Sequence, residues 1–369
     1  MKKMILPAFV LLFALLGCNL SSTPAATPGP TLPPTPAPSI RVALRAPDGS
    51  IQIVASGVSF DPSAPAFDSG LLPAGGYAGG TEFALDFTSG SQAQAMDASG
   101  TRSLSFVANP NYGLAVLPGS SPRLAWGTQL DPGGTTTTLD SAAPDGSGAT
   151  LLRSETADAN LPYELVAERW SADGGSLYYS KEPYGIGGYI PFPGASSLYR
   201  LDIASGNVTE LIPFNMQAGP SLCYEALSAD QRFLADHCTA QIRIHDLTSG
   251  SSTTIDLPAG ASGYGTVGDP RFSPDNSRVA YALAKGDPSA EQGLVALSDG
   301  LSGASHVILT GQPGEAEHVL AWLNASTLLL QSDSMSCSTT CPSSLWTIGV
   351  DGSNLKKLSD GTYLNLVLP

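Results

Sequence analysis

Alternating apolar and polar residues recur from Ile40 to the end of the chain, and helical periodicity is scarce. The clearest stretch is RFSPDNSRVAY at residues 271–281, where apolar positions flank a Ser-Pro-Asp-Asn turn. Proline fixes φ, aspartate and asparagine tolerate turn geometry, and Val279 and Tyr281 suit a pleated surface. The pattern therefore predicts a strand, a tight turn and a second strand.

Imperfect copies of this unit recur along the chain, at residues 169–180, 226–236, 271–281 and 321–331. Strand pairs joined by a glycine-containing turn follow three of them, at residues 197–212, 241–257 and 344–358. The equivalent anchor positions lie 57, 45 and 50 residues apart and are Trp170, Leu227, Phe272 and Trp322. A period of about 40 to 50 residues with four strands per unit is typical of propeller blades.

The two ends of this region lack partners of their own. Residues 40–54 resemble an outer hairpin without an inner strand, and residues 363–368 resemble a strand with no repeat after it. Pairing the two would close a ring and cover an exposed strand edge. The sequence therefore predicts an all-β fold, a single β-propeller of four-stranded blades, with seven blades favoured and six possible.

The turns carry a family resemblance. SPDN and SADG, each followed by an apolar strand and later by a strand ending in DG or SG, resemble the TolB-like, WD-like propeller repeats of bacteria. The resemblance covers residues 165–358 well and residues 40–152 poorly. It implies a propeller scaffold, which proteins of unrelated function share.

The first 39 residues have the pattern of an export leader followed by a tether. Lys2 and Lys3 precede an apolar run of 12 residues, Ile5 to Leu16, which is too short to span a bilayer and has signal-peptide form. Leu15-Leu16-Gly17-Cys18 resembles the lipobox of bacterial lipoproteins, which implies lipid attachment, palmitate included, at Cys18. A plain secretory signal cut near Gly17 is the alternative. We expect a signal peptide at 1–17, a lipidated Cys18 with a disordered Pro/Thr-rich linker at 18–39, and the propeller domain at 40–369.

Composition and charge exclude one class of partner. Charged residues make up 13% of the chain, with 40 Gly and 30 Pro, which suits short strands joined by turns. The formal net charge of −15 repels nucleic-acid phosphates, so no nucleic acid is expected as a partner.

The longer loops are expected to share one face of the propeller, where variable loops on a rigid scaffold carry binding. The aromatic residues on these loops are the candidate ligand-binding residues Tyr184, Tyr189, Phe192 and Tyr264. They could stack on a sugar or anchor a protein partner. The alternative is a local hydrophobic cluster over the blade.

Four cysteines follow Cys18, and in an exported protein an even number predicts disulfides. Cys223 and Cys238 lie on consecutive strands, and Cys337 and Cys341 share one loop, although three connectivities remain open. The four histidines are scattered, and His318 is expected in a solvated loop. No linear catalytic motif occurs, and neither a metal nor a cofactor is predicted.

We therefore expect an extracytoplasmic lipoprotein, anchored through Cys18 to the cell membrane or outer membrane. Its expected role is binding or scaffolding for an envelope protein, peptide or glycan, without enzymatic activity. The alternative is a propeller hydrolase or lyase with its site in the central channel. Such a site would bring carboxylates, histidine and arginine together from several blades without leaving a linear motif.

Overall fold

The computed structural model describes residues 38–64, 66–71, 77–79, 84–86, 92–117, 121–130, 134–157, 160, 162–184, 192–215, 222–285, 291–335 and 342–369. The predictions for the leader, Cys18, the tether up to residue 37, Tyr189, Cys337 and Cys341 lie outside these residues. Every regular element in the described part is a β-strand. No helix among the described residues is long and apolar enough to cross a membrane.

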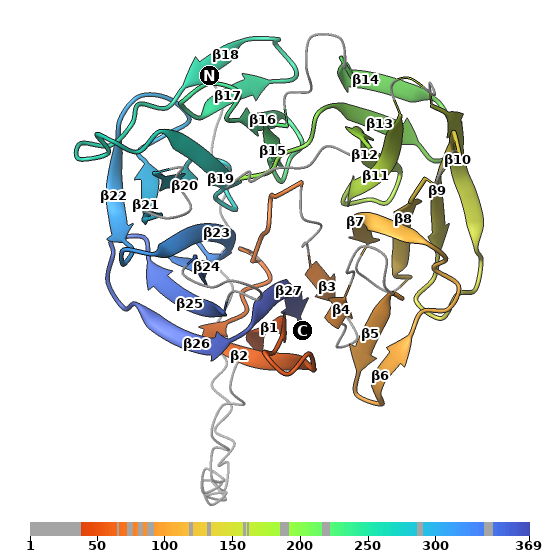
Figure 1. The fold of residues 1–369 in the computed structure, drawn as a ribbon, viewed down its shortest axis with the longest axis horizontal. Coiled ribbons are helices and arrows are strands. Elements are labelled where there is room, and N and C mark those ends of the chain that lie inside the picture. The colour runs from red at the N-terminus through yellow and green to blue at the C-terminus, as the bar shows by residue number, and fades with distance from the viewer. Residues whose placement is uncertain are drawn as a thin grey trace, which may run out of the picture. The chain divides into compact units, whose positions relative to one another are not determined.

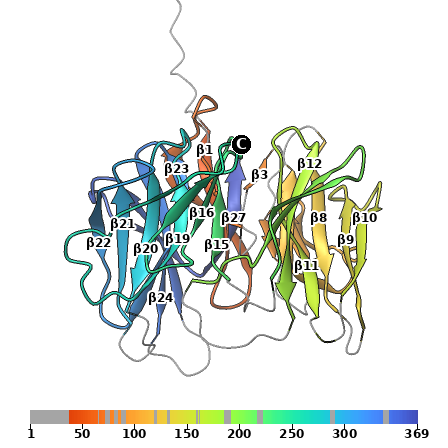
Figure 2. The same cartoon turned by 90° about the horizontal axis from the view of Figure 1, so that it is seen from above.

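Seven sheets surround a central axis, and their strands run roughly along that axis (Figures 1 and 2). The protein is an all-β, seven-bladed propeller, which confirms the predicted fold and the favoured blade number.

Blades 3 to 7 each contain four consecutive antiparallel strands, ordered from the axis to the rim. Blade 3 contains β7 (Pro110–Leu117), β8 (Arg123–Thr128), β9 (Thr136–Ala142) and β10 (Thr150–Thr156). Blade 4 contains β11 (Tyr163–Trp170), β12 (Ser176–Pro183), β13 (Leu198–Asp202) and β14 (Val208–Ile212). Blade 5 contains β15 (Tyr224–Leu227), β16 (Phe233–Asp236), β17 (Arg243–Asp246) and β18 (Ser252–Thr254). Blade 6 contains β19 (Thr266–Phe272), β20 (Val279–Ala284), β21 (Gly293–Ser298) and β22 (Ser305–Thr310). Blade 7 contains β23 (Glu315–Asn324), β24 (Thr327–Ser334), β25 (Ser343–Gly349) and β26 (Lys356–Asp360).

Blade 1 joins the two ends of the ring. From rim to axis it contains β2 (Ile51–Ser59), β1 (Ser39–Arg45), β27 (Thr362–Leu368) and β3 (Tyr77–Gly79). β1 and β27 pair antiparallel with Val42 opposite Leu366, which confirms the predicted closure. Blade 2 is described by β4 (Ala84–Asp86), β5 (Gln94–Asp97) and β6 (Gly100–Ser103).

The repeated turns share one hydrogen-bond pattern because their sequences are alike. In three blades the serine hydroxyl donates to the aspartate two residues later, at 2.6 Å each time, in the pairs Ser171–Asp173, Ser228–Asp230 and Ser273–Asp275. The fourth turn residue has a positive φ of +69° at Gly174, +61° at Gln231 and +57° at Asn276. Glycine and asparagine tolerate this region best, and the turns return each first strand into its neighbour.

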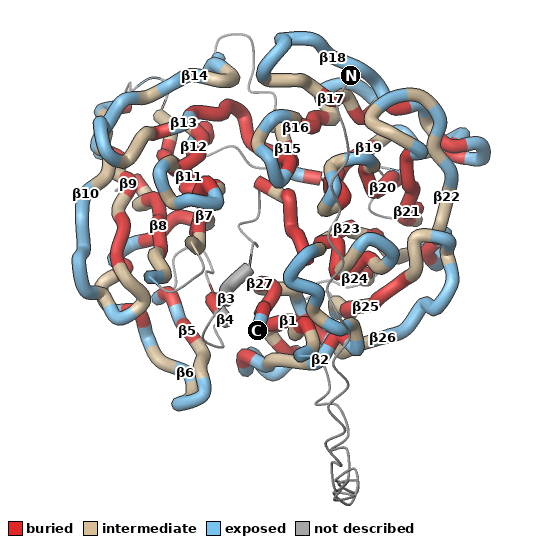
Figure 3. Tube along the Cα trace, turned by 180° about the vertical axis from the view of Figure 1, so that it is seen from behind, coloured by how far each residue is buried: buried red, intermediate tan, exposed pale blue. Residues whose placement is uncertain are grey.

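The core lies between adjacent blades. Trp170 is 4% exposed, and the other three anchors, Leu227, Phe272 and Trp322, are fully buried. Figure 3 shows buried residues along the strands near the axis and exposed residues along the rim. Each blade therefore buries its apolar faces against its neighbours, as a repeat architecture requires.

A short segment, residues 66–71, occupies the centre of the ring, and we call it the central segment (Figure 1). Phe67 bridges antiparallel to Trp322 of blade 7, and Gly70 bridges antiparallel to Ala226 of blade 5. Between these bridges, Ser69 Oγ accepts a hydrogen bond from the backbone N–H of Phe272 in blade 6 at 2.9 Å. The segment thus contacts the inner strands of three consecutive blades.

Side chains from two further blades also hold the central segment. Arg169 of blade 4 donates to the backbone carbonyl of Asp68, and its guanidinium lies 4.6 Å from the ring centroid of Phe67. The Tyr363 hydroxyl of blade 1 donates to Asp68 Oδ2 at 3.2 Å. Five blades therefore contact this short stretch of chain at the axis, an arrangement that the repeats alone do not predict.

Candidate active site at the channel mouth

In blades 3 to 7 the first strand begins, and the second strand ends, at the same end of the axis, because neighbouring strands of these blades are antiparallel. β12, β20 and β24 finish at this end of the axis, which we call the channel mouth. Blades 5, 6 and 7 place titratable side chains there. They come from β15, β19, β23 and β24 and from the end of β16, and they are Glu225, His237, Asp269, His318 and Asp333.

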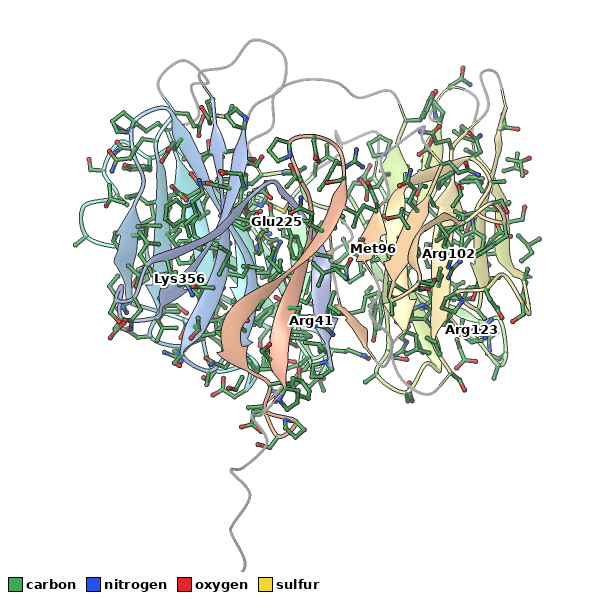
Figure 4. All side chains as sticks on the ribbon, turned by 90° about the horizontal axis from the view of Figure 1, so that it is seen from below. Arg41, Met96, Arg102, Arg123, Glu225 and Lys356 are labelled. Atoms are coloured by element: carbon green, nitrogen blue, oxygen red, sulfur yellow. A yellow bond between two sulfur atoms is a disulfide. The ribbon has the colours of Figure 1, made fainter. Side chains whose placement is uncertain are left out.

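Glu225 and His237 form the first pair in blade 5. His237 Nδ1 lies 2.9 Å from Glu225 Oε1, with 13% of the histidine side chain and 1% of the glutamate side chain exposed. The contact is an ion pair in which the ring N–H is not aligned with the oxygen, and within the described residues neither carboxylate oxygen has a hydrogen-bond partner. Figure 4 labels Glu225, which lies inside the ring.

A disulfide holds this pair together. Cys223 and Cys238 are bonded, with their Cα atoms 5.0 Å apart, and they lie next to the start of β15 and the end of β16. The backbone N–H of His237 also donates to the carbonyl of Cys223 at 3.0 Å. The predicted cysteine pair is thus confirmed, and it fixes the spacing of Glu225 and His237.

Asp269 and His318 form the second pair, between blades 6 and 7. His318 Nδ1 lies 2.7 Å from Asp269 Oδ2, and His318 Nε2 lies 3.6 Å from Asp333 Oδ2. One-fifth of the His318 side chain is exposed. The expectation of a solvated loop was wrong for His318, because β23 begins before it and places its ring against β19.

The backbone around Asp269 is unusual. Asp269 has a φ of +50°, precedes Pro270, and lies where the β19–β20 register shifts. Phe192 packs against the neighbouring Gly268 so closely that a Cβ there would lie 2.1 Å from the Phe192 Cβ. A strained, non-glycine residue held by its surroundings is a feature that clusters at functional sites.

The floor of the mouth connects these pairs to the central segment. The Arg271 guanidinium lies 3.3 Å from Asp68 Oδ1 and donates to the carbonyl of Leu320 at 2.9 Å. A Cβ on Gly70 would lie 2.7 Å from the same guanidinium, so glycine leaves room for it. Arg271 thus joins the central segment to the strand that carries Asp269.

Burial and charge set the protonation of these groups. Burial opposes the charged form of His318, but the carboxylates of Asp269, Asp333 and Glu317 outweigh it and raise its pKa to about 9. Burial likewise opposes a charged His237, and the Glu225 carboxylate still raises the pKa of that ring. Burial raises the pKa of Glu225. At neutral pH, His318 is therefore an imidazolium held beside carboxylates.

This arrangement is suited to acid–base chemistry. An imidazolium oriented by a carboxylate can protonate a leaving group, and a buried carboxylate paired with a second imidazole can accept a proton. Within the described residues, no group of three or more His, Cys, Asp or Glu side chains is placed to hold a metal ion.

The predicted aromatic candidates are separated in the structure. Phe192 is 1% exposed and packs with the core between blades 6 and 7, so its ring offers no surface to a ligand. Its cluster is not the local one over its own blade that the sequence suggested as an alternative. Tyr184 is 46% exposed, and Tyr264 packs beside the blade 5–blade 6 core with Lys285 Nζ 5.5 Å from its ring centroid.

Sequence reasoning missed Glu225, His237 and Asp269 as functional candidates. They are 12 to 44 residues apart along the chain, and three different strands or strand ends carry them. One signal was present, because each cysteine of the predicted disulfide lies within two residues of Glu225 or His237.

Similar chains occur among solved structures. No protein-family model and no curated protein matches the chain. Among solved structures, it is similar to the tricorn protease, with a TM-score of 0.48 and 11% identity over 87% of this chain and 34% of that one, so it spans about a third of that protein's length. It is also similar to an oligogalacturonate lyase in complex with manganese, with a TM-score of 0.46 and 17% identity over 77% of this chain and 74% of that one. A third similar structure is the WD40 domain of SCAP from fission yeast, with a TM-score of 0.39 and 9% identity over 76% of this chain and 72% of that one.

These likenesses concern the propeller fold and assign no activity to the chain. A protease and a lyase are among these similar structures. The convergence of histidines and carboxylates at the mouth is the feature named above as favouring an enzyme. The expectation of no enzymatic activity was therefore wrong in its reasoning, since it depended on the absence of a linear motif.

Proposed function

We propose that the protein is a propeller enzyme, a hydrolase or lyase, whose active site lies at the channel mouth. The observation that carries this proposal is the pair of histidine–carboxylate contacts, Glu225–His237 and Asp269–His318, supplied by three consecutive blades. The central segment supports it, because a channel that is crossed by chain excludes water better than an open one does.

In this proposal His318 is the general acid and the Glu225–His237 pair is the general base. Asp269 and Asp333 orient the His318 ring and keep it protonated. The surrounding carboxylates repel anions, so the favoured substrate is neutral or cationic at the bond that is cleaved.

Turnover by purified protein tests the proposal. The panel contains neutral chromogenic glycosides, esters, peptide anilides and a methyl-esterified, and therefore uncharged, uronate polysaccharide whose cleavage by elimination gives an absorbing product. We expect saturable turnover of one class, reduced by about 10²- to 10⁴-fold in His318→Gln and in His237→Gln. His306→Gln is the matched control, because its side chain is 52% exposed on rim strand β22. Turnover that survives both mouth variants, or none on any substrate, would contradict the proposal.

We also propose that the chain is exported and anchored through a lipid on Cys18. The Cys223–Cys238 disulfide supports an oxidising compartment. Cells fed a tagged fatty acid should label the wild-type protein and should not label Cys18→Ser. Equal labelling of the two proteins, or an unlabelled wild type, would overturn the anchor.

A further inference from the structure

A cavity of about 220 Å³ lies between blades 6 and 7, beside β22, β23 and β25. Glu317 lines it although only 4% of that residue is exposed. Consecutive residues of a strand point to opposite faces, so Glu317 and His318 belong to different sites on β23. The cavity is therefore separate from the channel mouth.

Blade 6 provides the space that Glu317 occupies. A Cβ on Gly311 would lie 2.6 Å from Glu317 Oε1, and a Cβ on Gly293 would lie 2.4 Å from the Glu317 backbone nitrogen. Two glycines on facing strands or strand ends thus let a carboxyl group enter the contact between blades. A small apolar residue would fill this contact without the cost of burying a carboxylate.

The carboxyl group lacks a cationic partner within the described residues. Its one hydrogen bond there is from Ser332 Oγ to Oε1, at 3.3 Å. The charged groups that act on it are Glu315, Asp333 and His318, and His318 is paired with Asp269 on the other face of β23. Burial, together with the charge of Glu315, raises the pKa of Glu317 to about 7. Two acidic side chains, Glu315 and Glu317, therefore line one cavity.

The remaining walls are largely apolar. Leu309, Leu355 and Trp346 line the cavity, and Leu355 is 47% exposed. The ring of Trp346 already attracts one ammonium group, because Lys357 Nζ lies 5.7 Å from its centroid. Lys357 itself is paired with Asp360 at 2.5 Å.

We propose that this cavity binds an organic cation, an ammonium group carried on an apolar chain. The ammonium group would pair with Glu317 and Glu315, and the chain would lie against Leu309, Leu355 and Trp346. A neutral sugar would leave the two carboxyl groups without a countercharge, and an anion would be repelled. The proposal does not depend on the enzymatic function of the channel mouth.

Calorimetric titration of the full folded chain tests the proposal with three probes. Hexylamine represents a free amine, N-acetyl-lysine methylamide represents a lysine side chain in a peptide, and 1-hexanol is the uncharged control. We expect one or both amines to bind and hexanol to bind at least about tenfold more weakly. Comparing the two amines identifies the source of the cation.

The variant Glu317→Gln keeps the shape of the side chain and removes its charge. We expect it to weaken amine binding by about 10- to 100-fold. Glu210→Gln on the rim strand β14 is the matched control and should bind as the wild type does. Because Glu317 binds the cation as a carboxylate, affinity should also rise as the pH increases through about 7, with proton release on binding.

A measurement on the wild-type protein does not depend on whether a variant folds correctly. The indole N–H of Trp346 donates to Ser344 Oγ at 2.8 Å, and its resonance should shift when an amine binds. Equal affinity for hexylamine and hexanol, binding that Glu317→Gln does not change, or a Trp346 resonance that does not move would each overturn the proposal. Binding of a neutral monosaccharide in place of the amines would do the same.

Discussion

His318 shows how burial and neighbouring charge compete at a single residue. Its ring is mostly buried, which disfavours the charged form, yet Asp269 and Asp333 approach its two nitrogens from different strands. The charges prevail because a partly buried ion pair is screened less than one in water. The same carboxylates that make His318 an acid at neutral pH therefore make it part of the fold's stability.

We expect part of the protein's stability to be lost as the pH becomes alkaline. The folded pKa of His318, about 9, lies above its ordinary value of 6.5, so its contribution is present in full below about pH 6.5. The contribution is then lost as the pH rises through about 9. Denaturant unfolding at a series of pH values measures this loss.

The variant Asp269→Asn should lower the pKa of His318. The stability of the variant should therefore change less with pH above about 6.5 than the stability of the wild type does. Nuclear magnetic resonance of the ring protons measures the pKa directly. Asp299→Asn is the control, because Asp299 pairs at 3.2 Å with the exposed His306 and is 64% exposed. A His318 pKa that does not change in Asp269→Asn would show that this carboxylate does not hold the proton.

At the scale of elements, the central segment and the blade 5 disulfide determine the geometry of the mouth. Residues 66–71 contact blades 5 and 7 through the backbone and blade 6 through the Ser69 hydroxyl, and Asp68 receives side-chain contacts from Arg169, Arg271 and Tyr363. A segment without regular structure is thus held firmly, because the backbone groups of Phe67, Ser69 and Leu71 have hydrogen-bond partners in blades 5 and 7.

We expect Gly70→Ala to destabilise the protein by about 1 to 3 kcal/mol, because the new methyl group would overlap the Arg271 guanidinium. Gly265→Ala is the matched control, since a Cβ there meets nothing within 4 Å. Chemical denaturation of the two variants measures the difference. If both variants unfold at the same denaturant concentration, the central segment can move aside without cost.

Removal of the disulfide should loosen blade 5. The two cysteines are 15 residues apart, and cross-linking a loop of that size contributes about 3 kcal/mol. We expect Cys223→Ser with Cys238→Ser to lower the free energy of unfolding by about that amount, and a reducing agent to act on the wild type in the same direction. If the double variant is as stable as the wild type, the disulfide does not stabilise the fold.

At the scale of the whole molecule, the ring is closed by pairing between its two ends. β1 and β27 come from opposite ends of the described chain and pair along residues 41–45 and 362–367. Because β1 pairs with β27, neither strand has an unpaired edge at this seam that could associate with another chain. Closure also places Tyr363 at the axis, where it contacts Asp68.

We expect Leu366→Ala to destabilise the protein by about 2 to 5 kcal/mol, because Leu366 is fully buried at this seam opposite Val42. Leu151→Ala is the control, since Leu151 is 57% exposed and its truncation should change stability by about 0.5 kcal/mol or less. Thermal unfolding of both variants measures the effect. Equal melting temperatures would mean that the seam contributes little to cooperative folding.

The sequence by itself determined the repeat, the turns and the closure, because these depend on local chemistry. Alternation specifies strands, Ser-x-Asp specifies the turns in blades 4, 5 and 6, and spacing specifies the blade. The unpaired stretches at residues 40–54 and 363–368 were enough to predict their pairing, and two cysteines on neighbouring strands were enough to suggest a disulfide.

Only the tertiary structure decided the site. Glu225, His237, Asp269 and His318 meet because three blades converge on one axis, and no periodicity in the sequence records which loop ends face each other there. The central segment has no repeat and no alternation, so its place in the ring depends on partners that are distant along the chain. Chemistry that is assembled from several blades is visible in the ring and invisible in any one repeat.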